Sequence, residues 1–359
     1  MSELDSASRA QDVTQARRRG RLSGSTTRKL KALFGVRRPA MVVLGALATI
    51  GFLDPRDSRS DARQAPAPRP FPIAEPSSHA FGRSGAVQVR FAMPGAPVEY
   101  PLRLSGDPTA LAYEWVRIAD AMTMELARPL AGDVLTAPRE PGFYHLALVR
   151  DGVRSVIDDL TVAVMLPFEQ KRGASIDGYR IGTYLAEMVG GGTLDRPDGF
   201  VKVTRADEAL SISKHLRMAD FLTQDGQTSW PRYAAVSPRV LDKLELVLAQ
   251  LAAWRGDSTR VGIEVDVHSA YRSPSYNRVV REAARDSRHQ YGDAVDVAID
   301  ANGDGRFTLS DARLVARAVE AVESRYPDLV GGMGVYASRR IRHPYVHIDA
   351  RGERARWRG

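Results

Sequence analysis

One short stretch in the second half of the chain, Ser287 to Asp296, holds a histidine and a carboxylate at a spacing that suits a single metal ion. His289 precedes Gly292, which permits a tight bend, and Asp296 lies in the apolar segment 294–299, which predicts a strand. A strand that begins after such a bend can bring the carboxylate of Asp296 back toward the imidazole of His289. The stretch therefore predicts two ligands of one metal site.

A third ligand is available in the segment Tyr345 to Asp349, where apolar and polar residues alternate around His347 and predict another strand. Two histidines and one carboxylate, with a fourth position open to water, form a recognised catalytic zinc site. Zinc lowers the pKa of a water that it binds and polarises a carbonyl group, which is the chemistry of amide hydrolysis. We therefore predict that His289, Asp296 and His347 bind Zn²⁺.

Three separated motifs, in this order, resemble the zinc D-Ala-D-Ala carboxypeptidase family, which also includes murein endopeptidases that cut peptidoglycan stem peptides. The motifs are Ser269-Ala270-Tyr271-Arg272-Ser273-Pro274 followed by Asn277, the Ser-x-His-x-x-Gly-x-Ala-x-Asp pattern of 287–296, and Val346-His347-Ile348-Asp349. The resemblance covers residues 233–357, with a weaker echo at 210–221. It implies an α+β zinc peptidase domain, in which helices flank an antiparallel sheet.

The resemblance also implies roles for residues around the metal. Arg272 is expected to bind substrate and to stabilise negative charge near the zinc, because a guanidinium group suits a developing oxyanion. An arginine that only pairs with a local carboxylate is the alternative. Tyr271, Asn277 and Ser287 are expected to bind substrate.

The general base is harder to assign. Several relatives carry Glu or Asp three residues before the last histidine, and this chain has Pro344 there. We assign Asp349, which shares a strand face with His347, as the catalytic candidate, either as the base or as a residue that orients His347. His343 is a further candidate for a proton donor.

A second metal loop follows the ligand strand, at 300–311. Oxygen-bearing side chains at positions 1, 3, 5 and 12, with glycine at position 6, match a calcium loop. The predicted calcium-site residues are Asp300, Asn302, Asp304, Arg306 and Asp311. Aspartate at position 12 resembles the dockerin type of loop. We predict a structural Ca²⁺ here, and the alternative is an Asp-Gly-rich turn without an ion.

Two further elements must position the zinc ligands. Ser237-Pro238 predicts the start of a helix, and the apolar positions 240, 241, 244, 248 and 251 predict that one face of this helix packs on the ligand-bearing sheet. The segment 263–268 predicts the strand that delivers Arg272 to the cleft. Residues 231–359 are therefore the predicted zinc peptidase domain.

The preceding chain predicts other units. Short alternating segments in 81–166, with a turn signal at Asp151-Gly152, predict a small all-β sandwich of immunoglobulin-like type. Residues 167–230 form a connecting region of irregular hairpins, and 54–80 is a Pro-rich linker without the means to build a core.

The net charge of +8 belongs to the N-terminus, because residues 1–39 hold ten Lys and Arg against three acidic residues. The remainder is nearly neutral, so we expect no nucleic-acid partner. The apolar run 40–53 is short for a membrane span, and it predicts an uncleaved signal anchor, a cleaved signal peptide or a buried helix. The absence of cysteine excludes thiolate zinc ligands and a cysteine nucleophile.

Together these patterns predict a zinc peptidase of the cell envelope, anchored in the inner membrane and facing the periplasm, or secreted to the periplasm if the signal is cleaved. Its expected partner is peptidoglycan, and its expected reaction is hydrolysis of stem peptides or cross-links by zinc-activated water. Two alternatives are a catalytically weakened zinc-containing protein that binds peptidoglycan and a peptidase for exported proteins. The oligomeric state and the bond that is cut stay open.

Overall fold

The computed structural model describes residues 75–76, 81–103, 107–130, 134–192, 194–256, 262–337 and 343–359. The predicted basic tail (1–39), the signal segment (40–53) and nearly all of the linker (54–80) lie outside these residues. Among the helices that are described, none is long and apolar enough to cross a membrane. Membrane attachment therefore stays a prediction from the sequence.

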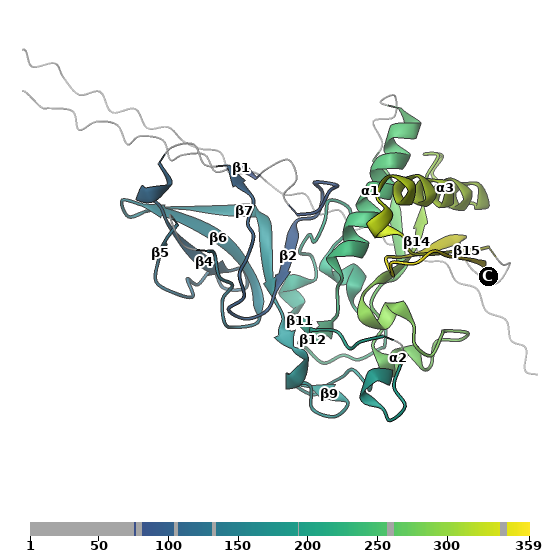
Figure 1. Ribbon diagram of the computed structural model, residues 1–359, viewed down its shortest axis with the longest axis horizontal. Coiled ribbons are helices and arrows are strands. Elements are labelled where there is room, and N and C mark those ends of the chain that lie inside the picture. Colours follow the sequence, from purple (N-terminus) through teal and green to yellow (C-terminus); the bar gives the residue numbers. More distant parts are fainter. Residues whose placement is uncertain are drawn as a thin grey trace, which may run out of the picture. The chain divides into compact units, whose positions relative to one another are not determined.

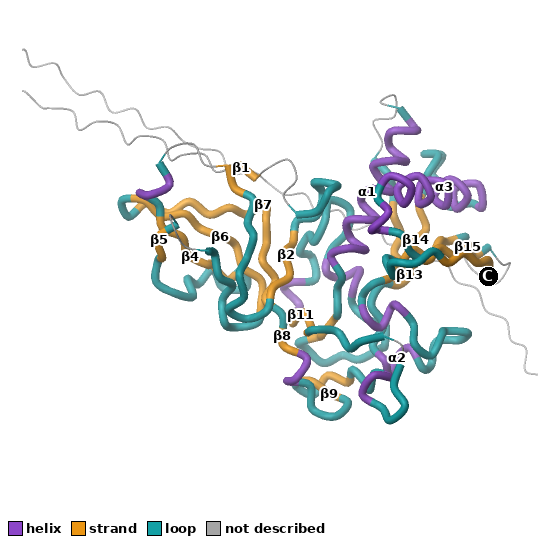
Figure 2. Tube along the Cα trace, viewed as in Figure 1, coloured by secondary structure: helices purple, strands orange, loops and turns teal. Residues whose placement is uncertain are grey.

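The first half of the described chain is built on a five-stranded sheet with the strand order β2-β7-β6-β4-β5 (Figures 1 and 2). Asp151 and Gly152 connect its two longest strands with φ angles of 52° and 76°, the left-handed conformation of a two-residue hairpin turn. The turn predicted at this dipeptide is therefore confirmed. The elements of this half are β1 (Glu75–Pro76), β2 (Val89–Ala92), β3 (Leu102–Arg103), η1 (Pro108–Ala110), β4 (Ala112–Arg117), β5 (Arg128–Pro129), β6 (Gly142–Arg150) and β7 (Val153–Val164).

This half differs from the predicted two-sheet sandwich. β1 and β3 form a separate ladder of two residue pairs, and β2 runs parallel to β7. Loop residues, instead of a second large sheet, contribute to the core on one face of the five-stranded sheet: Val98, Leu135 and Ala137 are buried in one cluster with Trp115 and Leu146. Alternation within each strand predicted an apolar face but could not show what would cover it.

Residues before β2 hold the five-stranded sheet against the C-terminal half. The backbone of Gln88 donates to Ile212 O at 3.0 Å and accepts from Thr161 N of β7 at 2.8 Å. Two further backbone N–H groups, of Arg83 and Ser84, donate to the carboxylate of Asp242 at 3.0 and 2.9 Å. This segment therefore makes hydrogen bonds to both halves of the described chain.

The region between the halves is a three-stranded sheet, β12-β11-β8, with several short turns of 3-10 helix. Its elements are β8 (Leu166–Pro167), η2 (Phe168–Gln170), β9 (Ser175–Ile176), β10 (Tyr179–Arg180), η3 (Leu185–Glu187), β11 (Gly199–Val203), η4 (Arg205–Asp207), η5 (Met218–Phe221) and β12 (Arg232–Ala234).

The C-terminal half contains a second five-stranded sheet, with the order β13-β14-β16-β15-β17. It is antiparallel except at one edge, where β17 runs parallel to β15, so the predicted fully antiparallel sheet is corrected there. The elements are α1 (Pro238–Arg255), β13 (Val265–Ser269), α2 (Pro274–Asn277), η6 (Arg288–Tyr291), β14 (Ala294–Ile299), α3 (Leu309–Arg325), η7 (Pro327–Leu329), β15 (Gly332–Tyr336), β16 (Tyr345–Asp349) and β17 (Ala355–Arg358).

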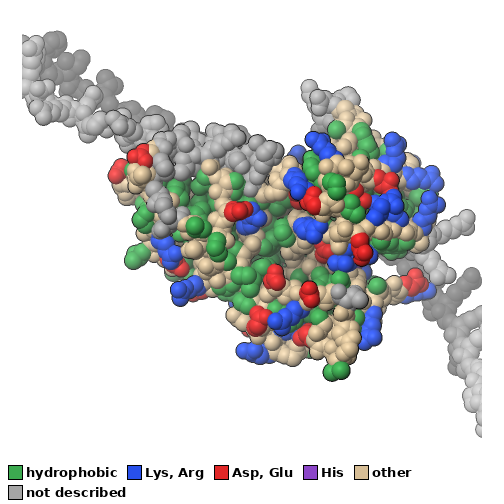
Figure 3. Space-filling view, in the orientation of Figure 1, with side chains coloured by type: hydrophobic (Ala, Val, Ile, Leu, Met, Phe, Trp, Pro, Cys, Tyr) green, Lys and Arg blue, Asp and Glu red, His purple; other side chains and the backbone are tan. Residues whose placement is uncertain are grey.

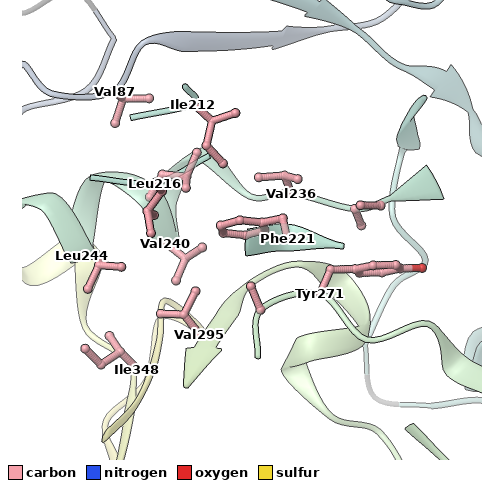
Figure 4. Packing of buried hydrophobic residues seen from close by; sticks show 14 of the residues in the cluster. Val87, Ile212, Leu216, Phe221, Val236, Val240, Leu244, Tyr271, Val295 and Ile348 are labelled. Atoms are coloured by element: carbon pink, nitrogen blue, oxygen red, sulfur yellow. The ribbon is translucent and has the colours of Figure 1, made fainter. Parts of the chain in front are cut away.

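Helix α1 begins at Pro238, after Ser237, as the sequence predicted. Its predicted apolar face is buried, and Val240 and Leu244 lie beside Val295 of β14 and Ile348 of β16 (Figure 4). Neighbouring residues on a strand point to opposite faces. The helices therefore cover one face of the sheet, and Asp296 and His347 point from the other.

Acidic and basic side chains are interspersed on the face shown in Figure 3. This pattern agrees with the nearly neutral charge of the sequence beyond residue 39.

Candidate metal centre

Strand register brings two of the three predicted ligands together. Asp296 of β14 is the cross-strand partner of His347 on β16, so both side chains stand on the same face of the sheet. His289 approaches from η6, which ends at Gly292 with a φ of 64°. A β-carbon at residue 292 would overlap the carbonyl group of Ala235, so both the bend and the packing require glycine there.

The three side chains converge through one atom each. Oδ1 of Asp296 lies 2.8 Å from Nδ1 of His347 and 3.2 Å from Nε2 of His289, and these two nitrogens are 3.1 Å apart. All three residues are buried. Within the described ranges, they are the only group of three or more His, Cys, Asp or Glu side chains whose ligand atoms all lie within 4.8 Å of one another.

The outer contacts of the two imidazoles decide which nitrogens face the centre. Nδ1 of His289 lies 2.6 Å from the carbonyl oxygen of Ala270, and Nε2 of His347 lies 3.2 Å from Oδ2 of Asp349. Because these partners are acceptors, each outer nitrogen carries hydrogen and each inner nitrogen presents a lone pair. Two lone pairs and a carboxylate oxygen that converge in this way fit a zinc ion.

The charges of the group also suit a cation. Burial alone would raise the pKa of Asp296, but His289 and His347 hold that pKa well below its usual range. Burial lowers the pKa of His289. Burial alone would also lower the pKa of His347, but its hydrogen bonds to Asp296 and Asp349 raise it. A proton and a metal ion compete for Nδ1 of His347, so metal binding is expected to weaken as pH falls.

Asp349 lies behind His347, on the side of the ring away from the other two ligands. Burial would raise the pKa of Asp349, but hydrogen bonds from His347 and Arg351 hold it far below its usual range. Its carboxylate accepts hydrogen bonds from Gly332 N at 2.7 Å and from Arg351 at 2.5 to 3.2 Å. Of the two predicted roles, this position favours orientation of His347 over service as the base.

A buried ion pair supports the same strand from the helix side. Nζ of Lys243 on α1 donates to Oε1 of Glu323 and to the carbonyl oxygen of Asp349, each at 2.7 Å. Glu323 also accepts a hydrogen bond from Arg356. Lys243 is fully buried, and its burial could not be predicted from the sequence because it lies among the apolar residues of α1.

Arg272 is placed beside the metal group by two fixed contacts. Its Nε donates to Oγ of Ser269 at 2.7 Å, and its Nη2 pairs with Oδ2 of Asp296. Its backbone N–H donates to the carbonyl oxygen of His289 at 3.0 Å. The predicted arginine therefore lies at the centre, and it does pair with a local carboxylate, which is itself a metal-ligand candidate.

A cleft of about 930 Å³ opens over this group. Tyr336, Tyr345 and Trp357 line it together with Arg272 and Ser287. Burial, followed by the negative charges of Asp296 and Tyr336, raises the pKa of Tyr345 to about 12. None of the three aromatic residues was among the predicted substrate-binding residues, although Tyr345 alternates with His347 on one strand and could have been found by that spacing.

The position of the indole ring of Trp357 requires glycine at residue 334. Gly334 is the cross-strand partner of both His347 and Trp357, and a side chain at residue 334 would collide with the indole ring. The ring therefore lies over the strand, 5.1 Å from the ring of His347, and its Nε1 donates to the hydroxyl group of Tyr336 at 2.8 Å.

Two predicted substrate-binding residues require correction. Tyr271 is 1% exposed, and its hydroxyl group lies 3.1 Å from that of Tyr184. Asn277 is 3% exposed, and its Nδ2 donates to Ala284 O at 2.9 Å. Neither side chain lines the cleft, so each supports a neighbouring segment. Ser287 does line the cleft.

The predicted calcium loop is held by its own hydrogen bonds. The carboxylate of Asp300 accepts from the backbone of Gly303, Asp304 and Gly305 at 2.8 to 3.1 Å. Asp311 accepts from Thr308 N at 2.9 Å and so caps α3. Asn302 donates to Asp304 through its side chain, and Arg306 does so through its backbone N–H. Calcium binding stays a prediction.

Residues 214–326 match the family model described as Peptidase M15. The match includes His289 and Asp296 and ends before His347. No curated protein and no solved structure gave a match. The family is one of zinc-dependent metallopeptidases, and the cluster of His289, Asp296 and His347 is compatible with that chemistry. Over residues 214–326, the C-terminal region of this chain is thus similar to the Peptidase M15 family.

Proposed function

We propose that this protein is a zinc-dependent peptidase that hydrolyses peptidoglycan stem peptides or their cross-links, as a D,D-carboxypeptidase or a murein endopeptidase. The convergence of two oriented imidazole nitrogens with Oδ1 of Asp296 at 2.8 to 3.2 Å carries the proposal. The peptide substrate is inferred from the resemblance of the motifs. The cell envelope is inferred from the apolar run 40–53 that follows a basic tail.

The residues of the centre have different roles in the proposed hydrolysis. A bound zinc ion would supply an activated water and polarise the scissile carbonyl group. Asp296 and the two histidines hold the metal, and Asp349 fixes the tautomer of His347. Arg272, which is held by Ser269 and Asp296, brings a positive charge to the cleft, where the carbonyl oxygen gains negative charge.

A second candidate function is a zinc-containing protein that binds peptidoglycan with weakened catalysis. It is favoured by Pro344 at the position where relatives carry an acidic residue, together with the place of Asp349 behind His347. Such a protein would keep zinc and substrate affinity but would turn substrate over slowly, because general base catalysis contributes about 10²- to 10⁴-fold to rates.

Product analysis tests both functions. The full chain is incubated with muropeptides, intact sacculi and an unfolded protein, with and without a chelator, beside a His289→Ala variant and a matched His145→Ala control. His145 lies on β6, outside the cleft, whereas the ring of His268 lies beside that of Tyr345, which lines the cleft. Loss of a terminal residue or splitting of a cross-link, absent in the chelator and His289→Ala samples, supports the hydrolase. Stoichiometric zinc and sacculus binding without product supports the binding protein, and cleavage of the unfolded protein alone refutes both.

Calcium is a separate proposal for the loop 300–311. Calorimetric titration of the full chain is expected to show one Ca²⁺ site that is lost in Asp300→Asn, because Asp300 supplies the first ligand position. Asp328→Asn, which changes an exposed carboxylate outside the loop, is the control. Equal heats in all three proteins would show that the loop is held by its hydrogen bonds alone.

A further inference from the structure

The side chain of Tyr345 lines the cleft beside the metal group. It stands two residues before His347 on β16, so both side chains leave the same face of the strand, about 7 Å apart at their backbones. It is half-buried and lines the cleft. A phenol is long enough to reach across this distance, so the hydroxyl group can approach a substrate atom that lies over the metal group.

The ring of Tyr345 is held in place by aromatic neighbours. It stacks on Tyr336, its cross-strand partner, with centroids 4.7 Å apart and planes at 9°. The ring of His268 lies 5.1 Å away on a tilted plane. These contacts fix the ring and therefore the direction of the hydroxyl group, which is the preorganisation that electrostatic catalysis requires.

Among the described residues, the hydroxyl group of Tyr345 has no hydrogen-bond partner, whereas the hydroxyl group of Tyr336 accepts from Trp357. Arg272 already donates to Ser269 and Asp296, so two of its nitrogens are engaged.

We propose that the hydroxyl group of Tyr345 donates a hydrogen bond to the carbonyl oxygen of the scissile amide as that oxygen gains negative charge, which makes Tyr345 a catalytic residue. The inference rests on the peptidase function proposed above. Tyr345 keeps its proton throughout: the water oxygen bonds to the carbonyl carbon, the C–N bond breaks, and both protons of the water reach the leaving amine. The products are a carboxylate and an ammonium group.

The Tyr345→Phe variant tests this role because it keeps the stacked ring and removes only the hydroxyl group. Loss of one oxyanion donor lowers kcat by about 10²- to 10³-fold in enzymes where it has been removed. We expect a fall of at least ~10-fold in kcat at this exposed cleft, with KM and zinc content unchanged. Tyr326→Phe, which removes a hydroxyl group outside the cleft, is the matched control and should behave as wild type.

A second measurement does not depend on turnover. A phosphinate analogue of D-Ala-D-Ala carries the charge of the tetrahedral state, so its Kd should rise in Tyr345→Phe by the same factor by which kcat/KM falls. Affinity for the unreactive ground-state dipeptide should not change.

The outcomes separate the two proposals. Turnover and phosphinate affinity within ~2-fold of wild type in Tyr345→Phe overturn the role of Tyr345 and leave the peptidase function intact. A wild type that cuts no stem peptide, but whose phosphinate affinity depends on Tyr345, refutes the function and supports the hydrogen bond. A wild type that neither cuts muropeptides nor binds the phosphinate overturns both.

Discussion

Replacing Asp349 by asparagine separates the two roles predicted for this residue, orientation of His347 and general base. In the native protein Oδ2 accepts from Nε2 of His347 at 3.2 Å and from Nη2 of Arg351 at 2.5 Å, and Oδ1 accepts from Gly332 N at 2.7 Å. Asparagine keeps the volume but has one acceptor oxygen. Because the backbone N–H of Gly332 is fixed whereas the side chain of Arg351 can move, the oxygen is expected to stay at Gly332 and the new NH₂ group to face His347, which must then accept at Nε2. The hydrogen of the imidazole moves to Nδ1, the atom directed at the metal group.

The expected effect is on metal affinity. Changes to the outer partners of ligating histidines weaken metal binding by about 10- to 100-fold, which is about 1.4 to 2.7 kcal/mol. We expect Asp349→Asn to reach the upper end of this range, because it reverses the tautomer and does not merely remove a contact. Competition with a fluorescent zinc chelator at neutral pH measures the change directly. Asp266→Asn is the matched control, since it alters an exposed carboxylate that lies 3.3 Å from Nε2 of His268.

Each role leaves its own signature in this experiment. Weak zinc binding, with turnover restored by excess zinc, indicates orientation of His347. Wild-type zinc affinity with turnover reduced by about 10²-fold or more would refute the reasoning from position and restore Asp349 as the base.

Three other changes test the surroundings of the centre. Gly334→Ala should displace the indole of Trp357 and destabilise the fold by about 1–3 kcal/mol in urea denaturation, and wild-type stability would contradict the close packing over β15. Lys243→Met should lower the free energy of unfolding by about 3–5 kcal/mol, because it leaves Glu323 buried without its lysine. A double variant with Glu323→Gln should recover part of this loss. If the single variant is as stable as wild type, the pair does not support β16. Burial, and next the charge of Asp349, raise the folded-state pKa of Asp293 to about 6, above an unfolded value of about 4. Between pH 4 and 6 the folded state therefore keeps a proton on Asp293 that the unfolded state has released. This residue should lower stability by up to roughly 3 kcal/mol as pH rises across that range in the metal-free protein, and Asp293→Asn should flatten that part of the curve of stability against pH.

Local features of the fold followed from local sequence. The Ser237-Pro238 pair marks the start of α1, Asp151-Gly152 turns the hairpin, and Gly292 takes the positive φ that the spacing of His289 and Asp296 requires. Each of these depends on a few neighbouring residues with restricted or permissive backbones. The spacing of the metal-ligand candidates is also a local feature, because alternation along a strand determines which side chains share a face.

The predictions that failed concern side chains whose contacts are made with residues far away in the sequence. Tyr271 was expected to bind substrate because its motif resembles that of the peptidase family, yet its hydroxyl group contacts Tyr184, 87 residues earlier in the chain. The bond of Lys243 to Asp349 O joins residues 106 positions apart. Sequence periodicity does not identify contacts between residues so far apart in the chain. The burial of a polar residue can therefore be predicted only when the element that covers it is known.

The network behind His347 explains why charged groups are kept in this core. A buried ion pair adds little stability by itself, since the desolvation of both charges offsets their attraction. Lys243 and Glu323 instead connect helices α1 and α3 to the end of β16, where Asp349 orients the imidazole. A displacement of this strand by even part of an ångström would misdirect the lone pair of Nδ1. The helix face of the sheet therefore supports the geometry of the metal group, while Arg272, Tyr336, Tyr345 and Trp357 line the cleft on the opposite side.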